Sequence, residues 1–228
     1  GFSMTLDYYE IDIENAITQV DSQYIVEQCL NNPANSSTAL CKSAGVSMDA
    51  TGRVKFNNQL QNVGSEKTSG VDLNLAYSFE AAGLNWKAGL DTTYLEEYVV
   101  AVTGSPVDYA GVITSGTGGY ADLKSNLTIN VSGDNWDAQY QARYIAGMDS
   151  FACIGKEDSC YAPSTPTVVY HDISGNYLVN DTVTLSAGVN NLFDKQPPYY
   201  TGNNDSNTDP YTYDVLGRRL FAGVNVKF

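Results

Sequence analysis

The sequence predicts an all-β fold, an antiparallel β-barrel that spans a membrane. Apolar and polar residues alternate along eight segments, the connections between these segments are alternately short and long, and aromatic residues lie near the short connections. Side chains of a membrane-spanning strand point alternately to lipid and to the barrel interior, and such barrels have short periplasmic turns and long extracellular loops. The predicted turns are 80–83, 133–135 and 180–181, and the predicted loops are 15–54, 101–117, 149–166 and 193–213.

The composition agrees with this fold and argues against several others. Hydrophobic residues make up 43% of the 228 residues. No run of about 18 apolar residues occurs, so no transmembrane helix is expected. A barrel is then the structure that can cross a bilayer, because backbone polar groups in lipid must be satisfied within the protein. The net charge of −14 argues against nucleic-acid binding, since a phosphate backbone requires a basic face.

The eight predicted strands are 2–14, 54–79, 84–94, 120–131, 136–144, 169–179, 183–190 and 216–228. In the first, the alternation changes phase after Tyr8, which indicates a β-bulge or a strand that leaves the membrane. The second begins with polar residues that we expect to project from the bilayer, and it alternates cleanly from Val71 to Phe79. The third to seventh strands carry apolar residues at nearly every second position, and turn-forming residues such as Gly83 follow the second strand.

The last strand shows the alternation most clearly. One face is entirely apolar, the other is mostly polar, and the sequence ends in an aromatic residue. A soluble domain rarely ends in this way, whereas an aromatic residue suits the interface between lipid and water. The apolar face consists of Leu220, Ala222, Val224, Val226 and Phe228, and the other aromatic residues predicted at the same boundary are Trp86, Trp136 and Tyr177.

Residues 15–54 form a long polar excursion between the first two strands. A short helix is predicted after the capping residues Asp21 and Ser22, because apolar residues then follow helical spacing at positions 25, 26, 29 and 30. A connection of this length is unusual in a compact domain and indicates a functional or capping role.

Four cysteines form two local pairs, Cys29 with Cys41 and Cys153 with Cys160. Neither pair has the spacing of a zinc site or of a thioredoxin-type motif. Their even number and polar surroundings predict two disulfides, and therefore an oxidising compartment or the cell exterior. Both pairs fall in predicted long loops, which agrees with an extracellular position of those loops.

The long loops also carry candidate ligand-binding residues. The segment 197–211 mixes aromatic, carboxylate and amide side chains, a combination that can stack on sugars or hold a metal chelate. The alternative is a solvated loop whose composition reflects turn formation. The candidates in the long loops are Tyr109, Tyr161, Tyr199, Tyr200, Asp205, Asp209 and Tyr211.

Charged residues are predicted inside the barrel as well. By alternation, Asp91, Asp122, Lys124 and Arg143 face the lumen, either as paired charges or as a lining. His171 is the only histidine and falls on the lipid-facing side, so an interfacial or packing role is expected. A single histidine argues against catalytic dyads and multi-histidine metal sites, and we predict no catalytic residues, no metal ligands and no cofactor.

Several motifs resemble those of TonB-dependent outer-membrane receptors. Residues 190–195 read Asn-Asn-Leu-Phe-Asp-Lys, and after a loop they are followed by Gly-Arg-Arg at 217–219 and by the terminal Phe228. The segment 69–73 is similar to an internal strand of the family, although it carries aspartate where glutamate is commoner. Residues 170–173 resemble the third-last strand, and the resemblance extends over essentially the whole chain.

This resemblance implies a particular architecture. Members of the family form a 22-stranded barrel that is closed around an N-terminal plug. Residues 1–228 then resemble about the last eight strands, and nothing in them matches the plug, the TonB box or the first strand. The terminal strand resembles the signal that the barrel-assembly machinery reads, and its residues of interest are Leu220, Val224, Val226 and Phe228.

The resemblance also implies a function, which is import of a scarce ligand across the outer membrane of a Gram-negative bacterium with TonB-coupled energy. A ferric siderophore, an oligosaccharide and a cobalamin-like compound all stay open as ligands. The implied partners are outer-membrane lipid, the small-molecule ligand, the barrel-assembly machinery, and the TonB complex acting through the plug domain. Two alternatives remain: a stand-alone eight-stranded barrel with a structural or adhesive role, and a soluble extracellular β-sandwich that binds a ligand.

Overall fold

The computed structural model describes residues 1–228 apart from positions 21, 33, 35, 36, 102–105, 116, 117, 203–206 and 228. Asp205 and Phe228, and the proposed helix cap Asp21, therefore lie outside the described residues. The chain divides into two compact units, one formed by 1–9, 69–97 and 109–228, and the other by 10–68 and 98–108. Each unit has a buried hydrophobic cluster of its own.

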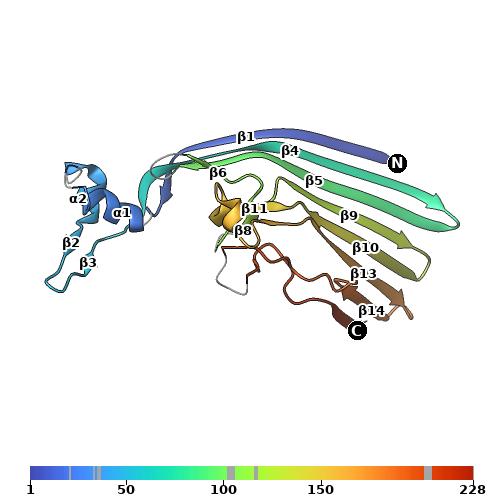
Figure 1. Ribbon diagram of the computed structural model, residues 1–228. Coiled ribbons are helices and arrows are strands. Elements are labelled where there is room, and N and C mark those ends of the chain that lie inside the picture. The colour runs from blue at the N-terminus through green and yellow to red at the C-terminus, as the bar shows by residue number, and fades with distance from the viewer. Residues whose placement is uncertain are drawn as a thin grey trace. The chain divides into compact units, whose positions relative to one another are not determined.

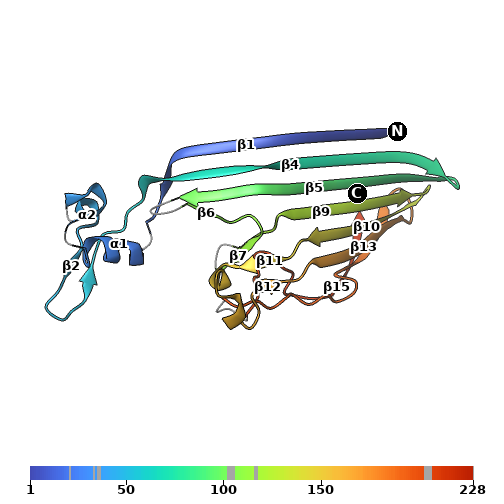
Figure 2. The same ribbon diagram turned by 45° about the horizontal axis from the view of Figure 1, so that its top comes forward.

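One sheet contains all the long strands of the described chain (Figure 1, Figure 2). The strands follow each other in the order β1-β4-β5-β9-β10-β13-β14-β15, and the short strand β6 (Val107–Asp108) pairs with β5. The long strands are β1 (Phe2–Thr18), β4 (Gln61–Ala81), β5 (Leu84–Ala101), β9 (Leu123–Ser132), β10 (Trp136–Ile145), β13 (Val168–Leu178), β14 (Val183–Asn190) and β15 (Arg219–Val226).

These long strands correspond one to one with the eight predicted strands, so the prediction of an antiparallel barrel sheet is confirmed. Within the described residues, β1 and β15 lie at the two ends of the strand order. The sheet is therefore part of a barrel wall and does not close on itself.

Two strand boundaries differ from the prediction. β1 continues to Thr18, and β4 begins at Gln61, whereas its predicted start was Val54. Val54 instead belongs to a separate hairpin, and Phe56 packs against the core of the excursion. The polar segment that we expected to extend the strand beyond the bilayer is thus the end of a small folded excursion.

The register of the sheet gives it one apolar and one polar face. Paired residues on successive strands line up in rows that cross the sheet. Rows two positions apart along a strand lie on the same face, and adjacent rows lie on opposite faces. One apolar row is Ala88, Ile129, Tyr140, Ile173, Val189 and Leu220. The adjacent row on the other face is Lys87, Asn130, Gln139, Ser174, Gly188 and Phe221. This arrangement confirms the alternation read from the sequence.

The short turns also lie where the sequence predicts them. Ala82 (φ 55°) and Gly83 (φ 74°) both have positive φ between β4 and β5, as a two-residue hairpin turn of type I′ requires. Between β13 and β14, the side chain of Asn180 accepts hydrogen bonds from the backbone N–H groups of Thr182 and Val183. The remaining short turn links β9 to β10.

The long connections of the first unit fold into a second, smaller sheet that the sequence did not predict. Its strands follow the order β12-β11-β7-β8, and their bounds are β7 (Val112–Thr114), β8 (Gly118–Tyr120), β11 (Met148–Ser150) and β12 (Ser164–Thr165). Two 3-10 helices, Phe151–Cys153 and Glu157–Ser159, lie between β11 and β12. The buried cluster beside this sheet consists of Ile113, Ala121, Met148, Val168, Tyr170, Tyr200 and Tyr213.

The second unit contains the excursion between β1 and β4. It is built from α1 (Ser22–Cys29), α2 (Ala39–Ala44) and the hairpin of β2 (Ser47–Met48) with β3 (Val54–Lys55). The predicted helix is therefore confirmed. Its core is Val20, Ile25 and Ala44, with Tyr24, Cys29, Leu40, Val46 and Phe56 packed around it.

Both predicted disulfides are present. Cys29–Cys41 joins α1 to α2, and Cys153–Cys160 links the end of the first 3-10 helix between β11 and β12 to the residue that follows the second. Helices of the described chain are all too short or too polar to cross a membrane.

Candidate functional site

Two cationic residues lie close together on the polar face of the main sheet. Cross-strand pairing places Lys124 opposite Thr93 and Ile145, and Arg143 opposite Asn126 and Tyr170. These pairs form two rows on the same face, because positions 124 and 126, like 143 and 145, are two residues apart on their strands.

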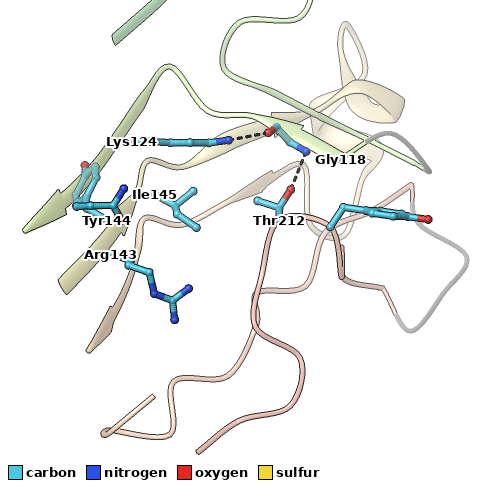
Figure 3. Close-up of a pocket in the computed structure, with 9 residues that line it drawn as sticks. Gly118, Lys124, Arg143, Tyr144, Ile145 and Thr212 are labelled. Atoms are coloured by element: carbon cyan, nitrogen blue, oxygen red, sulfur yellow. Dashed lines mark hydrogen bonds between the residues drawn. The ribbon is translucent and has the colours of Figure 1, made fainter. Parts of the chain in front are cut away.

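The loops turn this part of the face into a pocket (Figure 3). The cavity has a volume of about 300 Å³, which is at the lower end of the range of small-molecule sites. Its walls come from β9 and β10 of the main sheet, from β8 of the small sheet, and from the loop 191–218 that connects β14 to β15. The lining residues are Gly118, Gly119, Lys124, Asn126, Arg143, Tyr144, Ile145, Tyr211 and Thr212.

A chain of hydrogen bonds fixes the Lys124 side of the pocket. The ammonium Nζ of Lys124 donates to the carbonyl oxygen of Gly119 at 3.3 Å, and the backbone N–H of Gly119 donates to Oγ1 of Thr212 at 2.7 Å (Figure 3). The hydroxyl of Thr212 in turn donates to Oδ2 of the buried Asp209. A Cβ at Gly119 would lie 2.6 Å from Sδ of Met148 and 3.0 Å from Oγ1 of Thr212, so a side chain at this position would require Met148 to shift.

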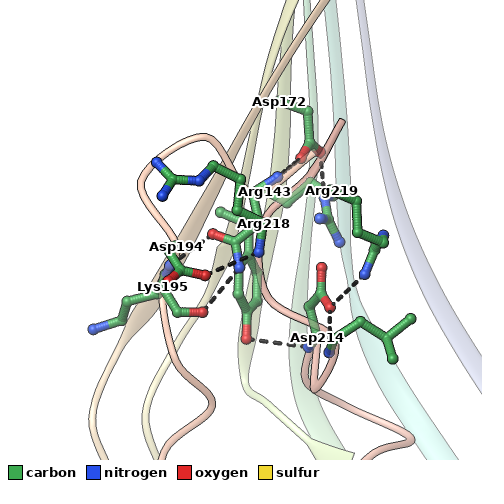
Figure 4. Close-up of polar contacts among 10 residues, drawn as sticks. Arg143, Asp172, Asp194, Lys195, Asp214, Arg218 and Arg219 are labelled. Atoms are coloured by element: carbon green, nitrogen blue, oxygen red, sulfur yellow. Dashed lines mark hydrogen bonds and ion pairs between the residues drawn. The ribbon is translucent and has the colours of Figure 1, made fainter. Parts of the chain in front are cut away.

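Arg143 is held from the opposite side. Its Nε donates to Oδ2 of Asp172 at 3.1 Å, and its guanidinium carbon lies 5.1 Å from the centroid of the Tyr170 ring. The other carboxylate oxygen of Asp172 accepts the backbone N–H of Asn191 at 2.7 Å. The charge of Arg143 is thus oriented by a carboxylate that is itself tied to the start of the loop 191–218 (Figure 4).

Both ends of the loop 191–218 are clamped (Figure 4). The side chain of Asn191, which is fully buried, bonds to both backbone groups of Lys195. Asp194 accepts the backbone N–H of Arg218 at 2.9 Å, so the two ends of the loop are joined. These contacts bring the Asn-Asn-Leu-Phe-Asp-Lys segment next to the Gly-Arg-Arg segment in the folded chain.

Asp214 anchors the end of the loop next to β15. Its Oδ1 accepts hydrogen bonds from Nη1 of Arg219 at 2.9 Å and from the N–H of Leu216 at 3.0 Å, and its own N–H donates to the hydroxyl of Tyr170 at 3.2 Å (Figure 4). Burial opposes ionisation of this carboxyl, but the hydrogen bonds from Arg219 and Leu216 and the charges of Arg219 and Arg143 outweigh it and hold its pKa below the usual value. Its Oδ2 is buried without a hydrogen-bond partner among the described residues.

Two buried tyrosines attach the loop to the small sheet. The hydroxyl of Tyr200 donates to the carbonyl oxygen of Thr114 at 3.2 Å, and that of Tyr213 donates to Oγ1 of Thr165 at 3.0 Å. Burial raises the pKa of Tyr213 to about 12, so this phenol stays neutral at physiological pH. The loop is therefore packed onto folded structure over much of its length.

The residues predicted to bind a ligand lie in different environments, and only some of them line the pocket. Tyr211, 77% exposed, lines the pocket together with Lys124 and Arg143. Tyr161 and Tyr199 are exposed elsewhere on the loops, at 99% and 69%, and neither lines this pocket.

The other predicted positions do not line the pocket. Tyr109 packs against the rings of Tyr120 and Phe151. Tyr200 and Asp209 are buried, and their contacts are structural. Asp205 lies outside the described residues.

Among the charged residues predicted on the polar face, Asp91 pairs with Asn126 in the Arg143 row, whereas Asp122 precedes β9 and accepts the backbone N–H of Leu95. His171 accepts or donates a 2.6 Å hydrogen bond with the hydroxyl of Tyr140 and packs edge-on against Phe193. Its contacts fit the expected packing role.

Sequence reasoning missed Gly119 and Thr212, which complete the pocket. They are 93 residues apart in the chain, and neither belongs to a motif that indicates binding. Asn126 could have been found, because it alternates with Lys124 on the same strand face. Within the described chain, no group of histidine, cysteine and carboxylate side chains is arranged to hold a metal ion.

An open antiparallel sheet with one apolar face, short turns on one side and long folded loops on the other defines a segment of an outer-membrane β-barrel. Residues 1–192 match the family described as TonB dependent receptor-like, beta-barrel. The chain therefore belongs to the TonB-dependent receptor β-barrel family, whose proteins lie in the outer membrane of Gram-negative bacteria. The resemblance and the location expected from the sequence are both confirmed.

Solved structures show the same fold. The siderophore receptor PirA from Acinetobacter baumannii matches with a TM-score of 0.58 and 17% identity, over 100% of this chain and 30% of the receptor. A mutant of the ferric enterobactin receptor PfeA from Pseudomonas aeruginosa, in complex with enterobactin, gives 0.60 and 16%, over 100% and 29%. The copper transporter OprC gives 0.56 and 16%, over 100% and 29%. The chain thus spans under a third of the length of these proteins, and no curated protein sequence matches it.

Proposed function

We propose that residues 1–228 form the C-terminal part of the barrel of a TonB-dependent transporter, which binds a scarce ligand outside the cell and imports it with TonB-coupled energy. The observation that carries this proposal is membership of the receptor family combined with a pocket between the polar face of the wall and folded loops. In the complete barrel the polar face lines the lumen, so Lys124, Arg143 and Asp91 lie on the path of the ligand.

The proposal assigns roles to partners outside this chain. The outer edges of β1 and β15, which pair with no other strand of the described chain, join the remaining strands of the barrel, because backbone groups in lipid must find hydrogen-bond partners. A plug domain closes the lumen and contacts the TonB complex. The barrel-assembly machinery inserts the barrel through its last strand, and the apolar rows then face outer-membrane lipid.

A transport experiment tests this function. The complete polypeptide that carries this chain is produced in a Gram-negative host that lacks its own siderophore and oligosaccharide receptors, in strains with and without TonB. Growth is measured on a panel of ferric siderophores as iron sources, oligosaccharides as carbon sources, and cobalamin. We expect one ligand class to restore growth only in the strain that contains TonB.

Two other outcomes would argue against the proposal of a TonB-coupled transporter. Growth restored equally without TonB would show passive diffusion. If no compound enters although the barrel is assembled in the outer membrane, as judged by heat-modifiable migration in gels, the stand-alone structural or adhesive barrel becomes the better explanation.

A further inference from the structure

One oxygen of the Asp214 carboxylate lacks a partner. Oδ1 accepts hydrogen bonds from Nη1 of Arg219 at 2.9 Å and from the N–H of Leu216 at 3.0 Å. Oδ2 is buried and has no hydrogen-bond partner among the described residues, and the side chain of Asp214 as a whole is 8% exposed. A buried, charged oxygen without a donor is costly, so such an atom in a folded protein indicates a missing contact.

Arg143 has unused donors close to this oxygen. A guanidinium group has five N–H donors, and Arg143 uses its Nε–H toward Asp172, whereas its terminal nitrogens have no hydrogen-bond partner among the described residues. Arg143 and Asp214 both contact Tyr170, one through the ring and the other through the hydroxyl, and they interact electrostatically. Figure 4 shows the guanidinium of Arg143 between the carboxylates of Asp172 and Asp214.

The charged side chains around this oxygen alternate in sign, in the order Asp172, Arg143, Asp214 and Arg219. Two links of this series are closed, Asp172–Arg143 at 3.1 Å within the wall and Asp214–Arg219 at 2.9 Å between the loop and β15. Among these described side chains, Arg143 and Asp214 are not within ion-pair distance. The open link is therefore the one that would join the C-terminal end of the loop 191–218 to the wall.

Closing this link does not require the other two links to open. The N–H groups of a guanidinium point in different directions, so one arginine can donate to two carboxylates at once. Oδ1 of Asp214 keeps its present donors while Oδ2 receives the new hydrogen bond. Within the described chain, Arg143 is held by one hydrogen bond and one ring contact, and its side chain is 35% exposed, so its terminal nitrogens are able to turn.

We propose that Arg143 is a latch for the loop 191–218. In the closed state its guanidinium bridges Asp172 on β13 and Oδ2 of Asp214 in the loop, and the structure describes the open state. The N-terminal end of the loop is already tied to Asp172 through the backbone N–H of Asn191. Closing the latch therefore fixes both ends of the loop to the same carboxylate of the wall, beside the pocket that Arg143 lines. The inference concerns the loop itself and goes beyond the proposed transport function.

Hydrogen exchange of the complete polypeptide in detergent, read by mass spectrometry, tests the latch at each end of the loop separately. Residues 209–216 report the C-terminal end and residues 191–196 the N-terminal end. Asp214→Asn removes the negative charge but keeps an oxygen that accepts hydrogen bonds from Leu216 and Arg219. We expect this variant to speed exchange at residues 209–216 at least about tenfold, the usual effect of losing one charge-assisted hydrogen bond.

Arg143→Lys is the decisive variant, because lysine keeps the positive charge but lacks the fork that spans Asp172 and Asp214. It should speed exchange at residues 209–216 as much as Asp214→Asn does. The double variant should exchange no faster there than either single variant, because both substitutions remove the same link. Arg218→Lys is the matched control: within the described chain, the Arg218 side chain makes one hydrogen bond of 3.4 Å to a backbone carbonyl, so this variant should exchange like the wild type.

Three patterns overturn the latch. The first is wild-type exchange at residues 209–216 in Arg143→Lys, or effects of Arg143→Lys and Asp214→Asn that multiply in the double variant. The second is faster exchange confined to the N-terminal end of the loop in Arg143→Lys, which would show that Arg143 acts only through Asp172. The third is loosening of residues 209–216 by Arg219→Lys but not by Arg143→Lys, which would assign Oδ2 of Asp214 to Arg219. None of these measurements involves transport, so their results do not affect the proposed function.

Discussion

Arg143 and Asp172 show how single residues connect the wall of the barrel to its loops. Asp172 uses one carboxylate oxygen to orient Arg143 and the other to hold the N–H of Asn191, the first residue after β14. Its side chain is 16% exposed, so removal of Arg143 would leave a mostly buried carboxylate without its counter-charge. One carboxylate thus positions both the pocket and the loop above it.

Ionisation of Tyr213 is expected to lower the stability of the loop 191–218 at alkaline pH. The folded-state pKa of about 12 lies above the value of about 10 in an unfolded chain, so the folded protein holds this proton more tightly. The corresponding stability is fully present below pH ~10 and is lost as the pH rises toward the folded-state pKa. We expect protection of loop residues 207–214 from hydrogen exchange to decrease over this range.

Tyr213→Phe removes the titrating group and the hydrogen bond to Thr165. This variant should be less protected at neutral pH, by an amount typical of one buried hydrogen bond (about 1 kcal/mol), and should lose less protection between pH ~10 and ~12. The matched control is Tyr211→Phe, because Tyr211 is exposed and shows no comparable burial. If Tyr213→Phe loses as much protection as the wild type between pH ~10 and ~12, ionisation of Tyr213 is not the cause of that loss.

At the residue level, the face on which a strand residue lies could be predicted from the sequence, whereas the contacts of a loop residue could not. Lys124 and Arg143 were assigned to the polar face because alternation is a local property of the chain. Tyr200 and Asp209 seemed suitable for ligand contact, yet both are buried, because their partners Thr114 and Thr212 depend on how the loops fold. Tyr200 and Thr114 are 86 residues apart, and nothing local marks that contact.

At the level of elements, the excursion between β1 and β4 relies on its disulfide. Its core has few fully buried residues, Val20, Ile25 and Ala44, and such a small core gives limited stability. The Cys29–Cys41 bridge, with a sequence separation of 12, constrains the unfolded state and should stabilise the excursion by about 3 kcal/mol.

We therefore expect reduction of Cys29–Cys41, or the variant Cys29→Ser/Cys41→Ser, to unfold α1 and α2 locally. The measurement is hydrogen exchange of residues 22–44, read by mass spectrometry. The strands β9 and β10, which make no use of this bridge, provide the internal control and should keep their protection. Equal loss of protection in both regions would show that the excursion is not an independent folding unit.

The elements that the sequence predicted well are those with a regular period. All the long strands were identified, and α1 was recognised from helical spacing. The small sheet β12-β11-β7-β8 was missed, because strands of two or three residues are too short to show alternation. Its β11–β7 pairing is parallel and joins distant segments, which no turn signal announces.

At the level of the whole molecule, the two faces of the sheet predict opposite responses to charge. Ile173 and Ser174 are neighbours on β13, but Ile173 belongs to the apolar row and Ser174 to the polar row. Ile173→Lys should destabilise the barrel in lipid by about 2–4 kcal/mol if it lies near the bilayer midplane, and by less near an interface. Ser174→Lys places the same charge on the polar face and should be close to neutral.

Urea titration of the complete polypeptide in lipid vesicles, followed by heat-modifiable migration, measures both variants. The difference between them is the result that matters, because the two substitutions share the strand, the depth and the charge. Equal destabilisation would contradict lipid contact of the Ile173 face. A soluble β-sandwich, which would bury Ile173 in protein, would instead keep its fold in the absence of lipid.

The two disulfides have a consequence for the biogenesis of the protein. Each joins cysteines that are close in the chain, with separations of 12 and 7 residues, and each lies inside a single connection between long strands. Oxidation therefore needs no contact between strands, and both bridges can form in the periplasm while the barrel is still unpaired. Local bridges of this kind allow the loops to be covalently closed before the strands pair, so disulfide formation does not depend on assembly of the barrel.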